Sequence, residues 1–111
     1  MSRLKIVETT PGKYSLLLNA GTTGVDAVVE SLGHEPNGYF WDGVARRLTA
    51  DAVDLKGRFG LDPEAGMFCA YGEDREALAA LADLMDPFTT DADRIRELVA
   101  AADAEGFDFD D

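Results

Sequence analysis

The sequence predicts an α+β fold, in which an antiparallel sheet of two hairpins carries four helices packed mainly on one face. Two pairs of short apolar segments are each joined by a turn sequence, which is typical of hairpins. Two segments with apolar residues at helical spacing follow each pair, and this arrangement favours a sheet covered by helices. The order strand–strand–helix–helix occurs twice and suggests a duplicated ββαα unit, although no residue-level repeat accompanies it. A chain of 111 residues is expected to form one domain, residues 1–111.

The first hairpin is predicted from residues 4–8 and 14–19, which are rich in Leu, Ile, Val and Tyr. Pro11 and Gly12 lie between the two strands and are a strong turn signal. Residues 9–13 are therefore expected to form the loop of this hairpin.

A short helix is predicted to begin at Thr23, because Asp26 follows at the spacing of a capping box. Gly33 is well placed to end this helix. A polar loop at 34–38 contains Pro and Asn-Gly, and a second helix is predicted at 39–50.

The second hairpin is predicted from residues 58–62 and 66–71, after a connector at 51–57 whose form the sequence does not indicate. The turn between these strands has the sequence DPEAG at 62–66, in which Pro and Gly are typical turn residues.

Two further helices are predicted from apolar stripes at helical spacing. The first stripe consists of Leu78, Leu81, Ala82 and Met85. The second consists of Ile95, Leu98, Val99 and Ala102. Pro87 is expected to end the first helix, Thr90 and Asp93 to cap the start of the second, and Gly106 to end it. The alternating tail at 107–111 predicts a short strand, or an extended tail with both Phe rings packed.

The charge balance of the chain favours a basic protein partner. Asp and Glu total 22 against 10 Lys and Arg, so the net charge is −12. Such a chain repels nucleic-acid phosphates and anionic membrane surfaces, so we expect neither as a partner. Opposite charges speed the encounter of two proteins, although the charge could also confer only solubility.

Cysteine content and hydropathy predict a cytoplasmic protein. Cys69 is the only cysteine, so the chain cannot form an intramolecular disulfide, which is consistent with a reducing compartment. The first residues lack the apolar core and cleavage site of a signal peptide. No apolar run approaches the roughly 20 residues of a membrane-spanning helix.

The motifs argue against catalysis, metal binding and cofactors. His34-Glu35 would need a second His four residues after the first for a zinc site, but that position is Gly38. Cys69 lies in an apolar strand, so we expect an inert buried thiol rather than a dyad with His34. No phosphate-binding loop or calcium loop occurs.

A small hydrolase remains an alternative, because paired carboxylates can act as acid and base. The candidate pairs are Asp62 with Glu64, Glu73 with Asp74, and Asp108 with Asp110. We interpret them as solvated turn and tail charges, since nothing in the sequence indicates a cleft.

The sequence GHEPNGYFWDGVA at 33–45 is the strongest candidate for a binding surface. Its three consecutive aromatic residues fan out by roughly 100° per residue on a helix, so one of them should lie near the surface. We expect Trp41 in the core and Tyr39 nearer the surface, although either could anchor a partner. Alternatively, all three aromatic residues pack, two in the core and one over the hairpin. The second hairpin carries acidic residues at its turn and exit, which could also be only turn residues and the cap of the next helix. The candidate partner-binding residues are Glu35, Asn37, Tyr39, Trp41, Asp42, Asp62, Glu64 and Asp74.

Two segments, GHEPNGYFWDGVA at 33–45 and DPEAGMFCAYGED at 62–74, resemble the immunity protein 51 family of bacterial polymorphic toxin systems. Residues 7–21 and 98–111 are similar to the family as well. The resemblance implies a small cytosolic protein that binds a toxin domain and blocks it, without catalysis. It names no toxin, but the net charge favours a cationic one such as a nuclease. The alternative is an interaction or regulatory module that has no toxin partner.

Overall fold

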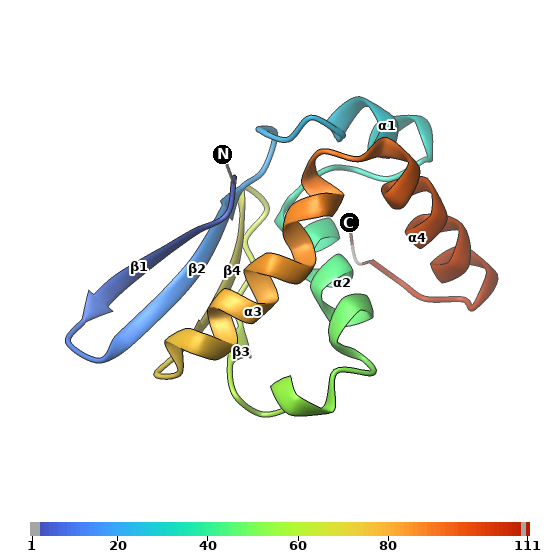
Figure 1. Ribbon diagram of the computed structural model, residues 1–111. Helices are drawn as coiled ribbons and strands as arrows, with labels where there is room; N and C mark the ends of the chain where they lie inside the picture. Colours follow the sequence, from blue (N-terminus) through green and yellow to red (C-terminus); the bar gives the residue numbers. More distant parts are fainter. Residues whose placement is uncertain (1–2, 110) are drawn as a thin grey trace.

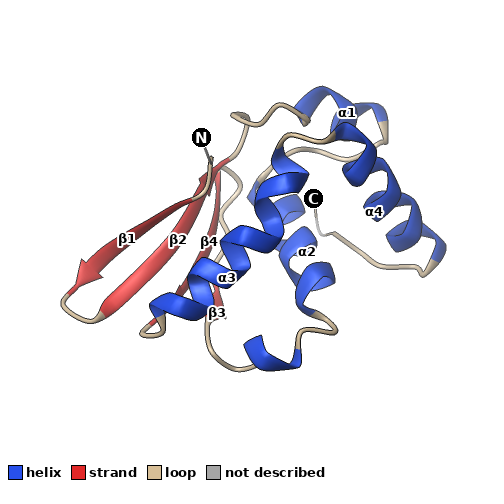
Figure 2. Cartoon of the chain, viewed as in Figure 1, coloured by secondary structure: helices blue, strands red, loops and turns tan. Residues whose placement is uncertain are grey.

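The computed structural model contains one antiparallel sheet, and its strand order is β1-β2-β4-β3. The structure describes residues 3–109 and 111. The strands are β1 (Lys5–Thr10), β2 (Lys13–Asn19), β3 (Gly60–Leu61) and β4 (Met67–Gly72). The helices are α1 (Asp26–Ser31), α2 (Gly38–Thr49), α3 (Arg75–Met85) and α4 (Ala92–Ala104), with 3₁₀ turns η1 (Val53–Leu55) and η2 (Asp86–Thr89). The predicted α+β fold with an antiparallel sheet of two hairpins is therefore confirmed (Figure 2).

The two hairpins join through β2 and β4, which pair antiparallel at the centre of the sheet. Leu16 lies opposite Ala70 and Leu18 lies opposite Phe68, and all four side chains are fully buried. Successive side chains of a strand point to opposite faces, so these residues define one inner face for the whole sheet.

The helices all lie on the inner side of the sheet, in two layers (Figure 1). Helices α2 and α3 pack directly on the strands, α2 mainly against β4 and α3 mainly against β2. Helices α1 and α4 pack against each other on the far side of α2. Among the described residues, no helix combines the length and apolarity needed to cross a membrane.

Three predicted boundaries were wrong. Strand β3 is only Gly60–Leu61 rather than 58–62, although the N–H groups of Asp62 and Glu64 still bond the carbonyls of Cys69 and Met67 on β4. Helix α1 begins at Asp26, and the Thr23 hydroxyl instead bonds the Asp26 carboxylate over 2.5 Å. Helix α4 is capped by Asp91 rather than Thr90, since the Asp91 carboxylate accepts the backbone N–H groups of Asp93 and Arg94.

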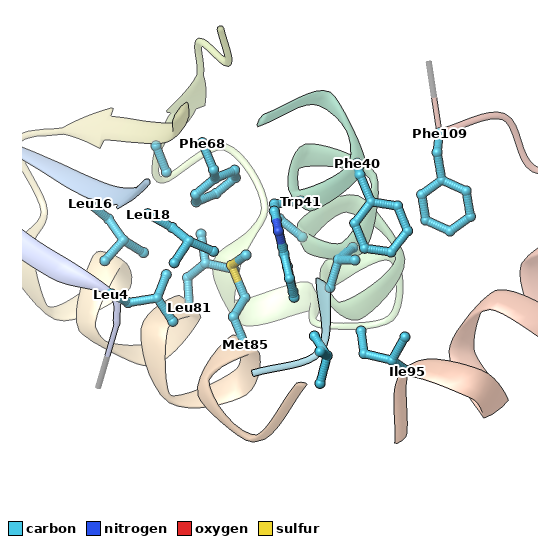
Figure 3. Packing of buried hydrophobic residues seen from close by; sticks show 14 of the residues in the cluster. Leu4, Leu16, Leu18, Phe40, Trp41, Phe68, Leu81, Met85, Ile95 and Phe109 are labelled. Atoms are coloured by element: carbon cyan, nitrogen blue, oxygen red, sulfur yellow. The ribbon is translucent and has the colours of Figure 1, made fainter. Parts of the chain in front are cut away.

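Trp41 lies at the centre of the buried cluster, between the sheet with α3 on one side and Phe40 on the other (Figure 3). Its side chain is fully buried, as the sequence predicts, whereas Tyr39 is 37% exposed. Phe40 meets the Trp41 ring edge-on with their centroids 5.4 Å apart. The indole N–H is buried and has no acceptor among the described residues, so Trp41 stabilises the fold through its apolar contacts.

Replacing Trp41 by Ala should lower the free energy of unfolding by about 3–5 kcal/mol, because it removes the largest side chain of the core. Trp41→Phe should cost clearly less, since the indole N–H has no acceptor among the described residues that Phe would lose. Urea unfolding followed by circular dichroism measures both. Tyr39→Ala is the matched control, and an equal loss in that variant would contradict the central role of Trp41.

Candidate interaction site

The start of α2 is held against the turn of the second hairpin. The Asn37 side chain accepts the N–H of Phe40 over 2.9 Å and so caps the helix. The Gly38 N–H donates to the carbonyl of Ala65 over 2.9 Å. A side chain at position 38 would collide with the backbone carbonyls of Glu64 and Met67, so only glycine permits this approach.

Hydrogen bonds hold the C-terminal tail against the loop before α2. The Asp111 carboxylate accepts the N–H of Glu35 over 2.7 Å and lies 2.9 Å from Nδ1 of His34. The other ring nitrogen of His34 lies 3.5 Å from the carboxylate of Asp103 on α4. His34 therefore connects the tail, the loop and α4.

Two aromatic rings of the tail pack on α2. Phe109 is buried, and its ring stacks on Phe40 at 5.0 Å between centroids. Gly43 leaves the space that the Phe109 ring fills. The guanidinium groups of Arg46 and Arg47 lie 5.0 and 5.3 Å from the centroid of the other tail ring, Phe107. Both Phe rings of the tail pack, as one of the two expectations had it, and residues 107–109 and 111 form no strand.

The structure removes Trp41 from the predicted contact residues, because a fully buried side chain cannot reach a partner of the folded protein. Three other predicted residues make contacts within the chain. Asn37 caps α2 and is almost fully buried. The Asp42 side chain is only 13% exposed and pairs with Arg46 over 3.1 Å.

Asp74 is the third of these residues, and its carboxylate caps α3. It accepts the N–H of Ala77 over 3.1 Å and the Nε–H of Arg58 over 2.8 Å. The hydrogen bond from Ala77, followed by the one from Arg58, lowers the pKa of the Asp74 carboxyl. Asp74 lies beyond the end of β4, and the strand separates it from Glu64, so the structure does not bring these two acids together.

The four remaining predicted residues, Glu35, Tyr39, Asp62 and Glu64, are exposed. Close packing of Gly38 on the hairpin turn brings the chain segments of Glu35 and Tyr39 next to that of Glu64. These residues stay a predicted contact surface.

The residues considered for catalysis are Cys69 and several carboxylates, and their surroundings differ. Cys69 is half-buried rather than fully buried, and its burial raises the pKa of the thiol. A raised pKa keeps the thiol protonated, which is typical of an unreactive cysteine. Of the carboxylate pairs, Asp74 is engaged as a helix cap, while Asp110 lies outside the described residues.

Sequence reasoning missed the roles of His34 and Gly43 in holding the tail. The alternation of Phe and Asp at 107–111 showed that the tail has two apolar side chains to bury. No local pattern indicated that α2 would receive them, because the contacts join residues more than 60 positions apart.

The model of a protein family described as immunity protein 51 matches residues 4–104. The chain belongs to the immunity protein 51 family. The match includes all strands and helices of the fold and both sequence motifs that resembled the family. No curated protein and no solved structure matches the chain. As an immunity protein 51 member, the chain has a toxin protein as the general class of partner.

In this immunity protein 51 member, Phe109→Ala should lower the free energy of unfolding by about 3–5 kcal/mol, because the ring is buried against Phe40. Phe107→Ala should cost less, since this ring is only partly buried. Urea unfolding of both variants tests this ranking. Equal, small losses in the two variants would contradict a tail that belongs to the core.

Stability should depend on pH through Asp74. The folded state lowers its pKa, so the stabilisation is present at neutral pH and is lost as the pH falls through the folded-state pKa. Asp74→Asn keeps a capping side chain but loses the charge opposite Arg58. The difference in free energy of unfolding between wild type and variant should therefore be largest at neutral pH and vanish in acid. A difference that stays constant with pH would contradict this role.

Proposed function

We propose that this protein binds a bacterial toxin domain and neutralises it without catalysing a reaction. The observation that carries the proposal is the family match across residues 4–104. The surroundings of His34 and Cys69, the two residues considered for nucleophilic catalysis, support a binding role. His34 holds the tail through Asp111, and the raised pKa of Cys69 disfavours the thiolate.

The proposed toxin is cationic, and a nuclease is the leading candidate. A net charge of −12 provides a long-range attraction to a basic active site that binds phosphates. Such an inhibitor presents carboxylates where the toxin would otherwise receive nucleic-acid phosphates. Electrostatic attraction of this kind acts mainly on the rate of association.

The proposed function is tested by co-purification from cells that produce the chain. The tagged protein is expected to retain a stoichiometric partner that forms the C-terminal part of a larger secreted protein. That partner should stop growth when expressed alone, and co-expression of this chain should restore growth. A partner that is harmless, or that belongs to a housekeeping complex, would contradict the proposal and favour a general interaction module.

The charge of the toxin is tested by binding kinetics. The association rate constant should fall by about tenfold or more as salt rises from low to high ionic strength, because salt screens the attraction. The dissociation rate constant should change much less. Association that is insensitive to salt would contradict a cationic toxin surface.

A further inference from the structure

The sheet has a second face that no described helix covers (Figure 1). Side chains on this outer face alternate along the strands with the buried residues of the inner face. The pairing places Leu17 opposite Cys69 and Ser15 opposite Tyr71, at the centre of the sheet. The apolar side chains of the outer face are Val7, Leu17, Met67, Cys69 and Tyr71.

Polar residues share the outer face at Lys5, Lys13, Ser15 and Asn19, but its centre is apolar, which is unusual for a sheet that faces solvent. Strand β4 has the sequence MFCAYG and carries no charged residue on either face. Apolar side chains at the centre of an uncovered sheet face, in a chain with net charge −12, are suited to contact with another protein.

Tyr71 is the most exposed of these apolar residues, at 50%. Its ring lies across Gly60 of the neighbouring strand, where any side chain would collide with it. A depression of about 300 Å³, lined also by Lys13, Ser15, Gly72 and Glu73, borders the ring. An exposed aromatic ring beside a depression is suited to anchor a partner.

Two acidic residues lie beside the apolar side chains. Asp62 donates its backbone N–H to Cys69 over 2.9 Å, and Glu64 forms a bridge with Met67. Within the described part of the chain, neither carboxylate has an ion pair or a side-chain hydrogen bond. The cations of this face lie elsewhere: Lys5 is on β1 at the opposite edge, and Lys13 lines the depression beside Tyr71. The acidic residues of the outer face are therefore gathered on the β3 side.

We propose that the toxin domain docks on the outer face, with an apolar group against Leu17 and Tyr71 and basic side chains against Asp62 and Glu64. This inference rests on the proposed function and names the surface that performs it. The charge pattern favours a cationic partner over a second copy of the chain, because two copies would each bring a net charge of −12.

The anchor is tested with the toxin domain identified by co-purification and growth rescue. Tyr71→Ala should weaken its affinity by about thirtyfold or more, the scale expected for an interface anchor. Leu84→Ala is the matched control, since it removes another exposed apolar side chain from α3 on the helical side, and it should change affinity less than about threefold. Equal affinities of wild type and Tyr71→Ala, or loss in Leu84→Ala alone, would overturn the docking surface.

The acidic edge is tested by charge reversal. The double variant Asp62→Lys, Glu64→Lys should lower the association rate constant by about tenfold or more. The control double variant Glu30→Lys, Asp83→Lys makes the same change in net charge at exposed positions of α1 and α3. Equal effects of the two variants would show that only net charge matters and would overturn the assignment of Asp62 and Glu64.

Cys69 provides a readout that leaves the outer face unmutated. As the only cysteine, it should react with a maleimide at least about tenfold more slowly once the toxin domain is bound. In the control variant Cys69→Ser, Glu97→Cys, the thiol on α4 should react equally fast with and without toxin. Protection at position 97 alone, or protection of Cys69 in the free protein that grows with its own concentration, would overturn the proposal.

The outcomes separate the two proposals. If the wild-type chain neutralises a toxin domain but the outer-face variants and the labelling behave as their controls, the docking surface is wrong and the function stands. If the wild-type chain neutralises no toxin domain, both are wrong.

Discussion

The burial of α2 on two sides is the constraint on which the rest of the structure depends. Phe40 and Trp41 are consecutive, so their side chains leave the helix roughly 100° apart, yet both are fully buried. Trp41 packs on the side of the sheet and α3, so the Phe40 ring must be covered by another part of the chain on its other side (Figure 3). The tail provides that cover through Phe109.

This constraint explains the composition of the segment at 33–45. Gly38 and Gly43 are the points where another part of the chain approaches the helix closely, the hairpin turn at one and the Phe109 ring at the other. His34 contacts the carboxylate of Asp111 in the tail, and Asn37 caps the start of the helix. A motif that resembled a binding patch is thus largely the structural centre of the molecule.

The two sides of the sheet therefore have different roles: the inner face is buried in the core, and the outer face is exposed. The inner face and its helices form the core, and several acidic residues there are neutralised by arginines, as Asp42 is by Arg46. The outer face carries apolar side chains and two exposed carboxylates, Asp62 and Glu64, that have no ion pair with any described residue. An inhibitor benefits from this arrangement, because a rigid surface loses little conformational freedom when a toxin domain binds.

Local patterns in the sequence were sufficient to predict the hairpins, the four helices and their apolar stripes, since periodicity and turn residues act within a few positions. They also placed Trp41 in the core and left Tyr39 at the surface, because three consecutive aromatic residues cannot share one helix face. Of the proposed docking surface, the sequence predicted the acidic residues Asp62 and Glu64 as contact residues but not the apolar side chains beside them.

Only the tertiary structure decided which segments meet across long sequence separations. The pairing of β2 with β4 places Leu17 against Cys69, and the tail reaches His34 from 77 positions away. The same packing brought Arg58 against Asp74, the local cap of α3, and left one face of the sheet uncovered by the described helices. The sequence determined the elements and their apolar faces, whereas the partner of each face follows from the mutual fit of all elements, which no local pattern contains.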